Sequence, residues 1–158
     1  MSRSDSYEIL SRYRTSPIFV FMLLLSYSIV AQEPSPAGNI PTPQEGDYIA
    51  RNFHFRSGEA LPELRMHYAT LGKPARDANG RVTNAVLILH GTGGTGRQFL
   101  QPQFAGELFG PGQLLDISRY YIILPDNLGH GKSSKPSDGM HAHFPQYEYE
   151  DMVAAQHE

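Results

Sequence analysis

Two stretches near the start of the folded region alternate between apolar and polar residues, as half-buried β-strands do. In residues 48–56 (YIARNFHFR), Ile49, Phe53 and Phe55 lie between polar or charged residues. Residues 61–68 (LPELRMHY) alternate in the same way, and a short Ser-Gly-Glu turn separates the two stretches. Two alternating runs joined by a short polar turn predict a β-hairpin.

Further along, two apolar runs are continuous instead of alternating: residues 85–89 (AVLIL) and 120–124 (YYIIL). Such runs are typical of strands in a parallel sheet that is covered on both faces. The segment between them is long enough for a crossover connection. We expect a helix within it over residues 98–108, although Pro102 weakens that expectation. The fold class predicted is α/β, with an antiparallel hairpin leading into a parallel sheet flanked by helices.

The last segment, residues 147–158, predicts the start of another helix. Glu148, Glu150 and Asp151 lie in its first turn, where acidic side chains favour the positive end of the helix dipole. The stripe expected to face the core, at helical spacing, consists of Tyr149, Met152, Val153 and Gln156. No signal for the end of a helix follows this pattern, so we expect that the helix continues in a longer chain.

The first residues have the pattern of a targeting segment. Basic residues precede residues 17–30 (PIFVFMLLLSYSIV), which are mostly apolar but shorter than the roughly 20 residues that span a bilayer. We therefore expect residues 1–31 to be a cleaved signal peptide and the protein to be periplasmic or secreted, with no stable membrane span after cleavage. Residues 32–46 are rich in proline and predict an extended linker, which leaves residues 47–158 as the folded domain.

Composition removes several kinds of function. The chain has 158 residues, a net charge of -3 and no evident basic patch, which argues against nucleic acid as a partner. It contains no cysteine, so a thiol nucleophile, a disulfide framework and a cysteine-based metal site are excluded. His141 and His143 have no third candidate ligand nearby, so we expect neither a metal nor a cofactor.

The most informative loop is residues 90–96 (HGTGGTG), directly after the first continuous run. One interpretation is an oxyanion loop, whose backbone N–H groups stabilise negative charge on a reacting carbonyl oxygen. The loop also matches the dinucleotide pattern G-x-G-x-x-G, with Asp126 as the ribose-binding acid. The preceding hairpin, His90 at the strand end and the lack of a helix-forming run at Gly96 count against that pattern. A third interpretation is a tight turn that binds nothing.

A second glycine-rich loop, residues 126–134 (DNLGHGKSS), follows the second continuous run. It would form one wall of a site at the carboxyl edge of the sheet, or serve only as a turn. Ser133 and Ser134 do not fit a nucleophile, because Lys135 stands where the motif G-x-S-x-G needs its second glycine. Asp126 is better explained as a carboxylate that caps this turn than as a catalytic acid.

At these loops the chain resembles the α/β-hydrolase superfamily. Residues 90–94 are similar to that superfamily's oxyanion loop, and residues 126–133 to its D-x-x-G-H-G-x-S loop. Other stretches narrow the resemblance to the homoserine O-acetyltransferase-like branch, and they are residues 64–72, residues 109–112, Asp116, residues 119–120 and residues 149–156. That branch normally has His-Ala where this chain has His90-Gly91, which favours a hydrolase relative over a homoserine-specific enzyme.

The resemblance implies a serine on a nucleophile elbow soon after the last helix, and then an acid and a histidine. The 158 residues contain no G-x-S-x-G. The resemblance assigns Gly91 and Thr92 to the oxyanion loop, with the Thr92 N–H as half of the oxyanion hole. We therefore expect the N-terminal fragment of an exported serine-type hydrolase acting on a small-molecule ester or acyl substrate and inactive alone. The strand ending at Leu89 would be an exposed edge, with self-association as a hazard.

Two alternatives remain at this stage. The chain could be a non-catalytic module that binds or pairs through its open sheet edge. Less favoured is a dinucleotide-binding domain.

Overall fold

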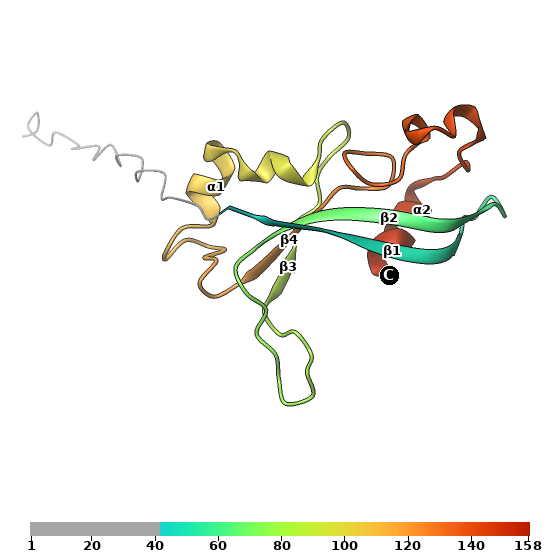
Figure 1. Cartoon of the computed structure of the whole chain (residues 1–158). Helices are drawn as coiled ribbons and strands as arrows, with labels where there is room; N and C mark the ends of the chain where they lie inside the picture. Colours follow the sequence, from blue (N-terminus) through green and yellow to red (C-terminus); the bar gives the residue numbers. More distant parts are fainter. Residues whose placement is uncertain (1–41) are drawn as a thin grey trace, which may run out of the picture. The chain divides into compact units, whose positions relative to one another are not determined.

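The computed structural model describes residues 42–158, which form one four-stranded mixed sheet (Figure 1). β1 (Gln44–His54) pairs with β2 (Ala60–Leu71) as an antiparallel hairpin, and β2 pairs antiparallel with β4 (Tyr121–Pro125). β3 (Ala85–Leu87) pairs parallel with β4, which gives the order β1-β2-β4-β3. The hairpin and the parallel pair predicted from the sequence are both present.

The start of the sheet lies slightly earlier than the predicted domain boundary at Asp47. β1 already begins at Gln44, so residues 44–46, which the sequence assigned to the linker, belong to a strand. The predicted signal peptide, residues 1–31, and most of the linker lie outside the described residues.

The hairpin is closed by a turn in which Gly58 has φ +89 and donates its N–H to Phe55 O at 2.9 Å. Midway along the hairpin, Asn52 has a φ of 53. The pairing of β1 with β2 skips Asn52 and also Pro62, which has no N–H to donate. Asparagine is among the residues that adopt this left-handed conformation most readily. Before Asn52 in the chain, the buried pair is Ala50 and Leu64; after it, the buried pair is Phe53 and Leu61. The irregular residue at Asn52 therefore lets the side chains of both halves of the hairpin pack into the same core.

The sheet carries a separate apolar core on each face. The first is covered by α2 (Tyr149–His157) and by the segment before it, and its buried members are Ala50, Phe53, Phe55, Leu61, Leu64, Met66, Leu128, Phe144 and Ala155. The second is covered by α1 (Pro102–Leu108), and its buried members are Ala69, Leu71, Ala105, Phe109, Ile122 and Leu124. β2 and β4 lie in the middle of the sheet and hold the two cores together.

The helix predicted over residues 98–108 is in fact divided. A 3-10 helix spans Gly96–Leu100, and α1 begins afresh at Pro102. Proline at the first helical position loses no hydrogen bond, because that N–H has no partner within a helix. Pro102 therefore starts the helix, whereas the sequence interpretation took it as a weakness inside one.

The predicted buried stripe of the last helix is wrong in two positions. In α2, Tyr149 is 71% exposed and Val153 is 48% exposed, whereas Asp151 and Ala155 are buried. The helix is turned this way because Asp151 is anchored: its carboxylate accepts the Glu148 N–H at 2.9 Å and the Arg56 N–H at 2.8 Å. The predicted acidic first turn is thus a capping box that also ties the helix to the end of β1.

β3 is the outermost strand of the described sheet, and burial of residues 85–89 on both faces is therefore not found. The strand ends at Leu87, with one more ladder bond from the Ile88 N–H to Ile123 O at 3.0 Å. Leu87 is 48% exposed and Leu89 is 46% exposed, because no described strand lies beside them.

None of the helices in residues 42–158 is long and apolar enough to cross a membrane.

Candidate functional site

The glycine loop leaves the carboxyl end of β3 through a tight turn. The Gly94 N–H donates to Gly91 O at 3.1 Å, and Gly93 has φ +76. A bond from the first to the fourth residue, with a positive φ at the third, is the pattern of a type II turn with Thr92 at its second position. Gly91 and Thr92 are exposed, and within residues 42–158 the Thr92 N–H donates to no protein acceptor. This amide is free to bind a group from outside the described residues.

The glycines of this loop differ in whether the surrounding structure would tolerate a side chain. A Cβ on Gly96 would overlap the backbone of Leu124 and Pro125, so this residue is required for packing against β4. A Cβ on Gly91 would meet nothing within 4 Å. The packing of the described residues therefore does not need a glycine at position 91, and the open space lies beside the Thr92 amide.

His90 links the start of this loop to the loop after β4. Its side chain is buried, and its Nε2 accepts the Asn127 N–H at 2.9 Å. A nitrogen that accepts carries no proton, so the proton of the neutral ring lies on Nδ1, which donates to Gly91 O at 2.8 Å. The edge of the ring packs against His130, with the ring centroids 5.2 Å apart. Both nitrogens of His90 are thereby committed.

Asp126 links the other end of the same loop. Its buried carboxylate accepts the Gly96 N–H at 2.9 Å through Oδ1 and the Lys132 N–H at 2.8 Å through Oδ2. Gly131 passes so close to this carboxylate that a Cβ would overlap it. The prediction that Asp126 caps the turn is confirmed. Both of its oxygens are used inside the protein, which leaves the dinucleotide interpretation without its ribose-binding acid.

Ser133 and Ser134 hold the second loop against β2. The Ser133 hydroxyl is fully buried, donates to Asp126 O at 2.6 Å and accepts the His67 N–H at 2.9 Å. The Ser134 hydroxyl accepts the Arg65 N–H at 3.0 Å. These bonds replace ladder bonds that β2 lacks at this point, and they support the prediction that neither serine is a nucleophile.

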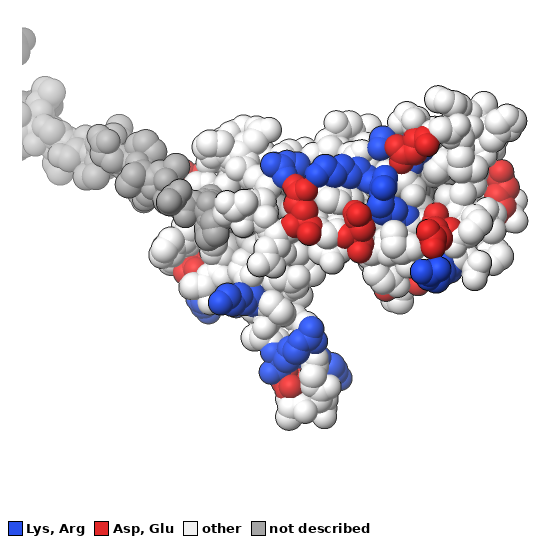
Figure 2. Space-filling model, viewed as in Figure 1, with Lys and Arg blue, Asp and Glu red and all other residues white. Residues whose placement is uncertain are grey.

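A charged cluster on one face was missed by the sequence analysis. Glu45 pairs with Lys132 at 2.6 Å and also with Arg97, while the buried His67 places Nδ1 2.7 Å from Asp47 Oδ1. The hydrogen bond from Lys132, with the nearby positive charges, holds the pKa of Glu45 below its usual value. Figure 2 shows Lys and Arg side chains in a row on this face with acidic groups beside them. These pairs join segments far apart in sequence, so no local pattern announces them.

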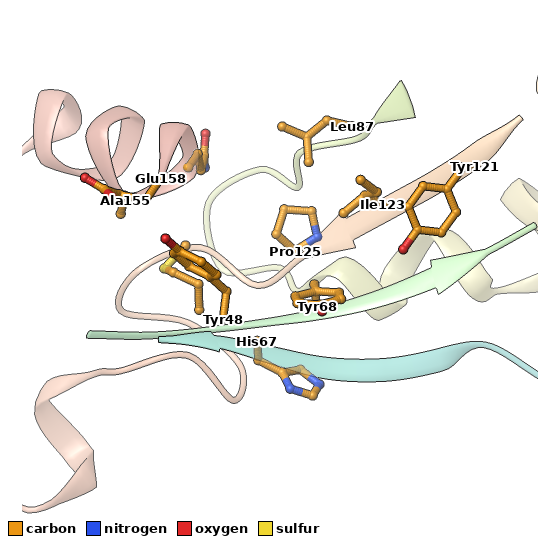
Figure 3. A pocket seen from close by; sticks show the side chains of 11 residues that line it. Tyr48, His67, Tyr68, Leu87, Tyr121, Ile123, Pro125, Ala155 and Glu158 are labelled. Carbon is orange, nitrogen blue, oxygen red and sulfur yellow. The ribbon is translucent and has the colours of Figure 1, made fainter. Parts of the chain in front are cut away.

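On the face that carries α2, a shallow cavity of about 330 Å³ lies between the sheet and the end of that helix. Its apolar lining includes Tyr48 and Ile123 from the sheet, Leu87 from the open edge and Ala155 from α2 (Figure 3). The ring of His67 points to the opposite side of the sheet in this view.

His141 and His143 are exposed, and no group that could hold a metal ion is found among the described residues.

The chain is similar to known acyltransferases and esterases, although no protein-family model matches it. It is 35% identical over 139 residues to a homoserine O-succinyltransferase from Aromatoleum aromaticum, covering 78% of this chain and 36% of that protein. It is 35% identical to a homoserine O-acetyltransferase from Leifsonia xyli, over 66% of this chain and 28% of that one. The chain spans about a third of the length of these relatives.

Solved structures give the same result at the level of the fold. An acetylester hydrolase from Corynebacterium glutamicum superposes with a TM-score of 0.57 at 24% identity, covering 73% of this chain and 31% of that one. The acetyl esterase MekB superposes with a TM-score of 0.57 at 26% identity, covering 77% and 33%. The described residues therefore form part of an α/β-hydrolase fold. In sequence, the chain is similar to homoserine O-acyltransferases over about a third of their length.

Proposed function

We propose that residues 44–158 supply the oxyanion-binding part of a serine-type acyl-transfer site. The observation that carries this proposal is the exposed Thr92 N–H, which stands at the carboxyl end of β3 in a turn that is fixed at both ends. Preformed backbone donors of this kind stabilise the negative oxygen that develops when a nucleophile attacks a carbonyl carbon. The neighbouring Gly91 leaves room for a substrate to reach this amide.

The substrate is an ester or acyl group of a small molecule, in keeping with the names of the relatives. The family resemblance implies that the rest of the site consists of a serine on a nucleophile elbow, an acid and a histidine. These three residues would lie in a part of the protein beyond residue 158. A polypeptide of these 158 residues contains no G-x-S-x-G and is expected to show no turnover by itself. The transfer of the acyl group to water would make the whole protein an esterase, and transfer to an alcohol an acyltransferase.

The test begins with the coding DNA beyond codon 158. If the open frame continues into G-x-S-x-G, the whole product should hydrolyse a p-nitrophenyl ester, and replacing the elbow serine by alanine should abolish turnover. A correctly folded product with an intact elbow serine and no turnover on acetyl, butyryl or succinyl esters would contradict the proposal. If the frame ends at codon 158, the catalytic proposal fails for this protein.

If the reading frame ends at codon 158, the open edge of β3 favours a second candidate function, a module that pairs with a strand of another molecule. Leu87 and Leu89 stay exposed at this edge within the described sheet. Residues 32–158 should then melt cooperatively and form a defined dimer by sedimentation. A polydisperse aggregate without a cooperative transition would rule this candidate out.

We also propose that the protein is exported to the periplasm or secreted, with residues 1–31 removed. The support is the order of basic and apolar residues at the start of the sequence. Cell fractionation and N-terminal sequencing of the mature product test it. Leu24→Arg, in the middle of the apolar segment, should retain the protein in the cytoplasm at full length, whereas the control Ser4→Arg should not. Export of the Leu24→Arg variant would count against a signal peptide.

A further inference from the structure

The Gly91–Thr92 peptide is held from a single side. Its carbonyl oxygen accepts the Nδ1–H of His90 at 2.8 Å and the Gly94 N–H at 3.1 Å. The imidazole cannot turn away, because its Nε2 accepts the Asn127 N–H and its ring packs against His130. The ring is also buried, with only 6% of the residue exposed.

The direction of this carbonyl determines the direction of the neighbouring amide. A peptide bond is planar and trans, so its C=O and its N–H point to opposite sides. When Gly91 O points to the buried ring of His90, the Thr92 N–H must point to the opposite side, away from that ring. A rotated peptide would turn the amide inward and leave the oxyanion position without this donor.

We propose that His90 is a positioning residue, which keeps the Thr92 N–H directed at the oxyanion through the neutral tautomer with its proton on Nδ1. The catalytic consequence of this role rests on the proposed function, whereas the tautomer of His90 and the orientation of the peptide do not. His90 itself touches neither the substrate nor the reacting atoms.

The same contact joins the loop to the last helix. Asn127 donates its N–H to His90, and its side-chain oxygen accepts a hydrogen bond from Gln156 of α2. The series Gln156, Asn127, His90 and Gly91 O therefore runs from the helix to the proposed oxyanion donor without a gap. In the family pattern the nucleophile elbow follows this helix, so His90 would set the donor in register with the segment that brings the serine.

The first test is spectroscopic and needs no turnover. In 15N spectra of the histidine rings of the whole gene product, His90 should show a protonated Nδ1 and an unprotonated Nε2. A scalar coupling across the hydrogen bond should connect Nε2 to the Asn127 amide. Through-bond correlations assign these signals in the unaltered protein. The opposite tautomer, or a doubly protonated ring at neutral pH, would overturn the inference.

The second test uses two substitutions that divide the ring's functions. His90→Asn keeps a donor near the Nδ1 position, and His90→Gln keeps a polar group only near the Nε2 position. With p-nitrophenyl acetate, His90→Gln should lower kcat about 10²-fold with little change in KM, the low end of what removal of an oxyanion donor costs. His90→Asn should recover most of that loss. The same two changes at the exposed His54 are the control.

The outcomes separate the two proposals. If the unaltered protein turns over ester and His90→Gln is as fast, the positioning role is refuted while the proposed function survives. If His90→Gln and His90→Asn lose kcat equally, a donor to Gly91 O is not what matters, and the inference also fails. If the unaltered protein with an intact elbow serine has no turnover but the predicted tautomer is seen, the proposed function fails and the structural part of the inference holds.

Discussion

Replacing Thr92 by proline removes one hydrogen-bond donor and leaves the loop around it intact. Thr92 occupies the second position of the turn closed by the Gly94 N–H and Gly91 O, and proline is common at that position in type II turns. The side chain is exposed, and the lost N–H has no protein acceptor within residues 42–158. The free energy of unfolding should therefore stay the same or rise by about 0.4–1 kcal/mol, because proline restricts the unfolded chain.

The catalytic effect should be large by comparison. Removing one donor of an oxyanion hole costs roughly 10²–10³-fold in kcat, or about 2.7–4 kcal/mol of transition-state stabilisation. The assay is ester hydrolysis by the whole gene product, with kcat and KM measured separately and thermal unfolding recorded for each variant. Thr92→Ala keeps the amide and is the matched control, so it should retain kcat within a few-fold. A Thr92→Pro protein that is fully folded and as fast as Thr92→Ala would refute the assignment of this amide.

Three further predictions concern stability and association. Gly96→Ala should destabilise the fold by about 1–3 kcal/mol in urea unfolding, because its Cβ overlaps the backbone of β4, whereas Gly91→Ala should stay within about 0.5 kcal/mol. The Gly112 N–H, at 2.7 Å, and other local donors hold the pKa of Asp116 below its usual value, so its contribution to stability is present above the unfolded-state pKa and lost as pH falls through the folded one. Leu89→Lys, at the exposed edge, should reduce self-association of the 158-residue chain in sedimentation without lowering its melting temperature.

Each of these has an outcome that would contradict it. Equal destabilisation by the two glycine substitutions would show that the space beside Gly91 is not open. Asp116→Asn should make stability less dependent on pH between the two pKa values, and an unchanged acid limb would show that this carboxylate contributes nothing. If Leu89→Glu and Leu89→Lys both leave the association unchanged, the edge of β3 is not the surface involved.

The parts of the fold that could be predicted are those that a local pattern determines. The alternation in residues 48–56 and 61–68 correctly placed β1 and β2 as strands. It was wrong about Ile49, which is 37% exposed while Ala50 is buried, because the buried positions of β1 shift by one residue at Asn52. The position of the Gly91–Thr92 loop also followed from the apolar run before it. The stripe of α2 could not be predicted in this way, because Asp151 turns the helix through a bond to Arg56, 95 residues away in sequence.

The contacts that shape the candidate site are equally non-local. The bond from the Asn127 N–H to His90 joins residues 37 apart, and that from the Gly96 N–H to Asp126 joins residues 30 apart. In sequence His90 looks like an ordinary strand-end residue, and nothing beside it identifies its partner. Its type was a signal nevertheless, because a histidine between an apolar run and a glycine loop can both donate and accept.

The exchange of bonds between the two loops also has a consequence for the order in which the protein folds. His90 of the first loop binds the backbone of the second, and Asp126 of the second binds the backbone of the first. Neither loop can reach its final shape before the other, so both must form together once β3 and β4 have paired. Because long-range contacts of this kind are closed at an entropic cost, they are expected after the rate-limiting step. Substitutions at these two residues should then speed unfolding more than they slow folding.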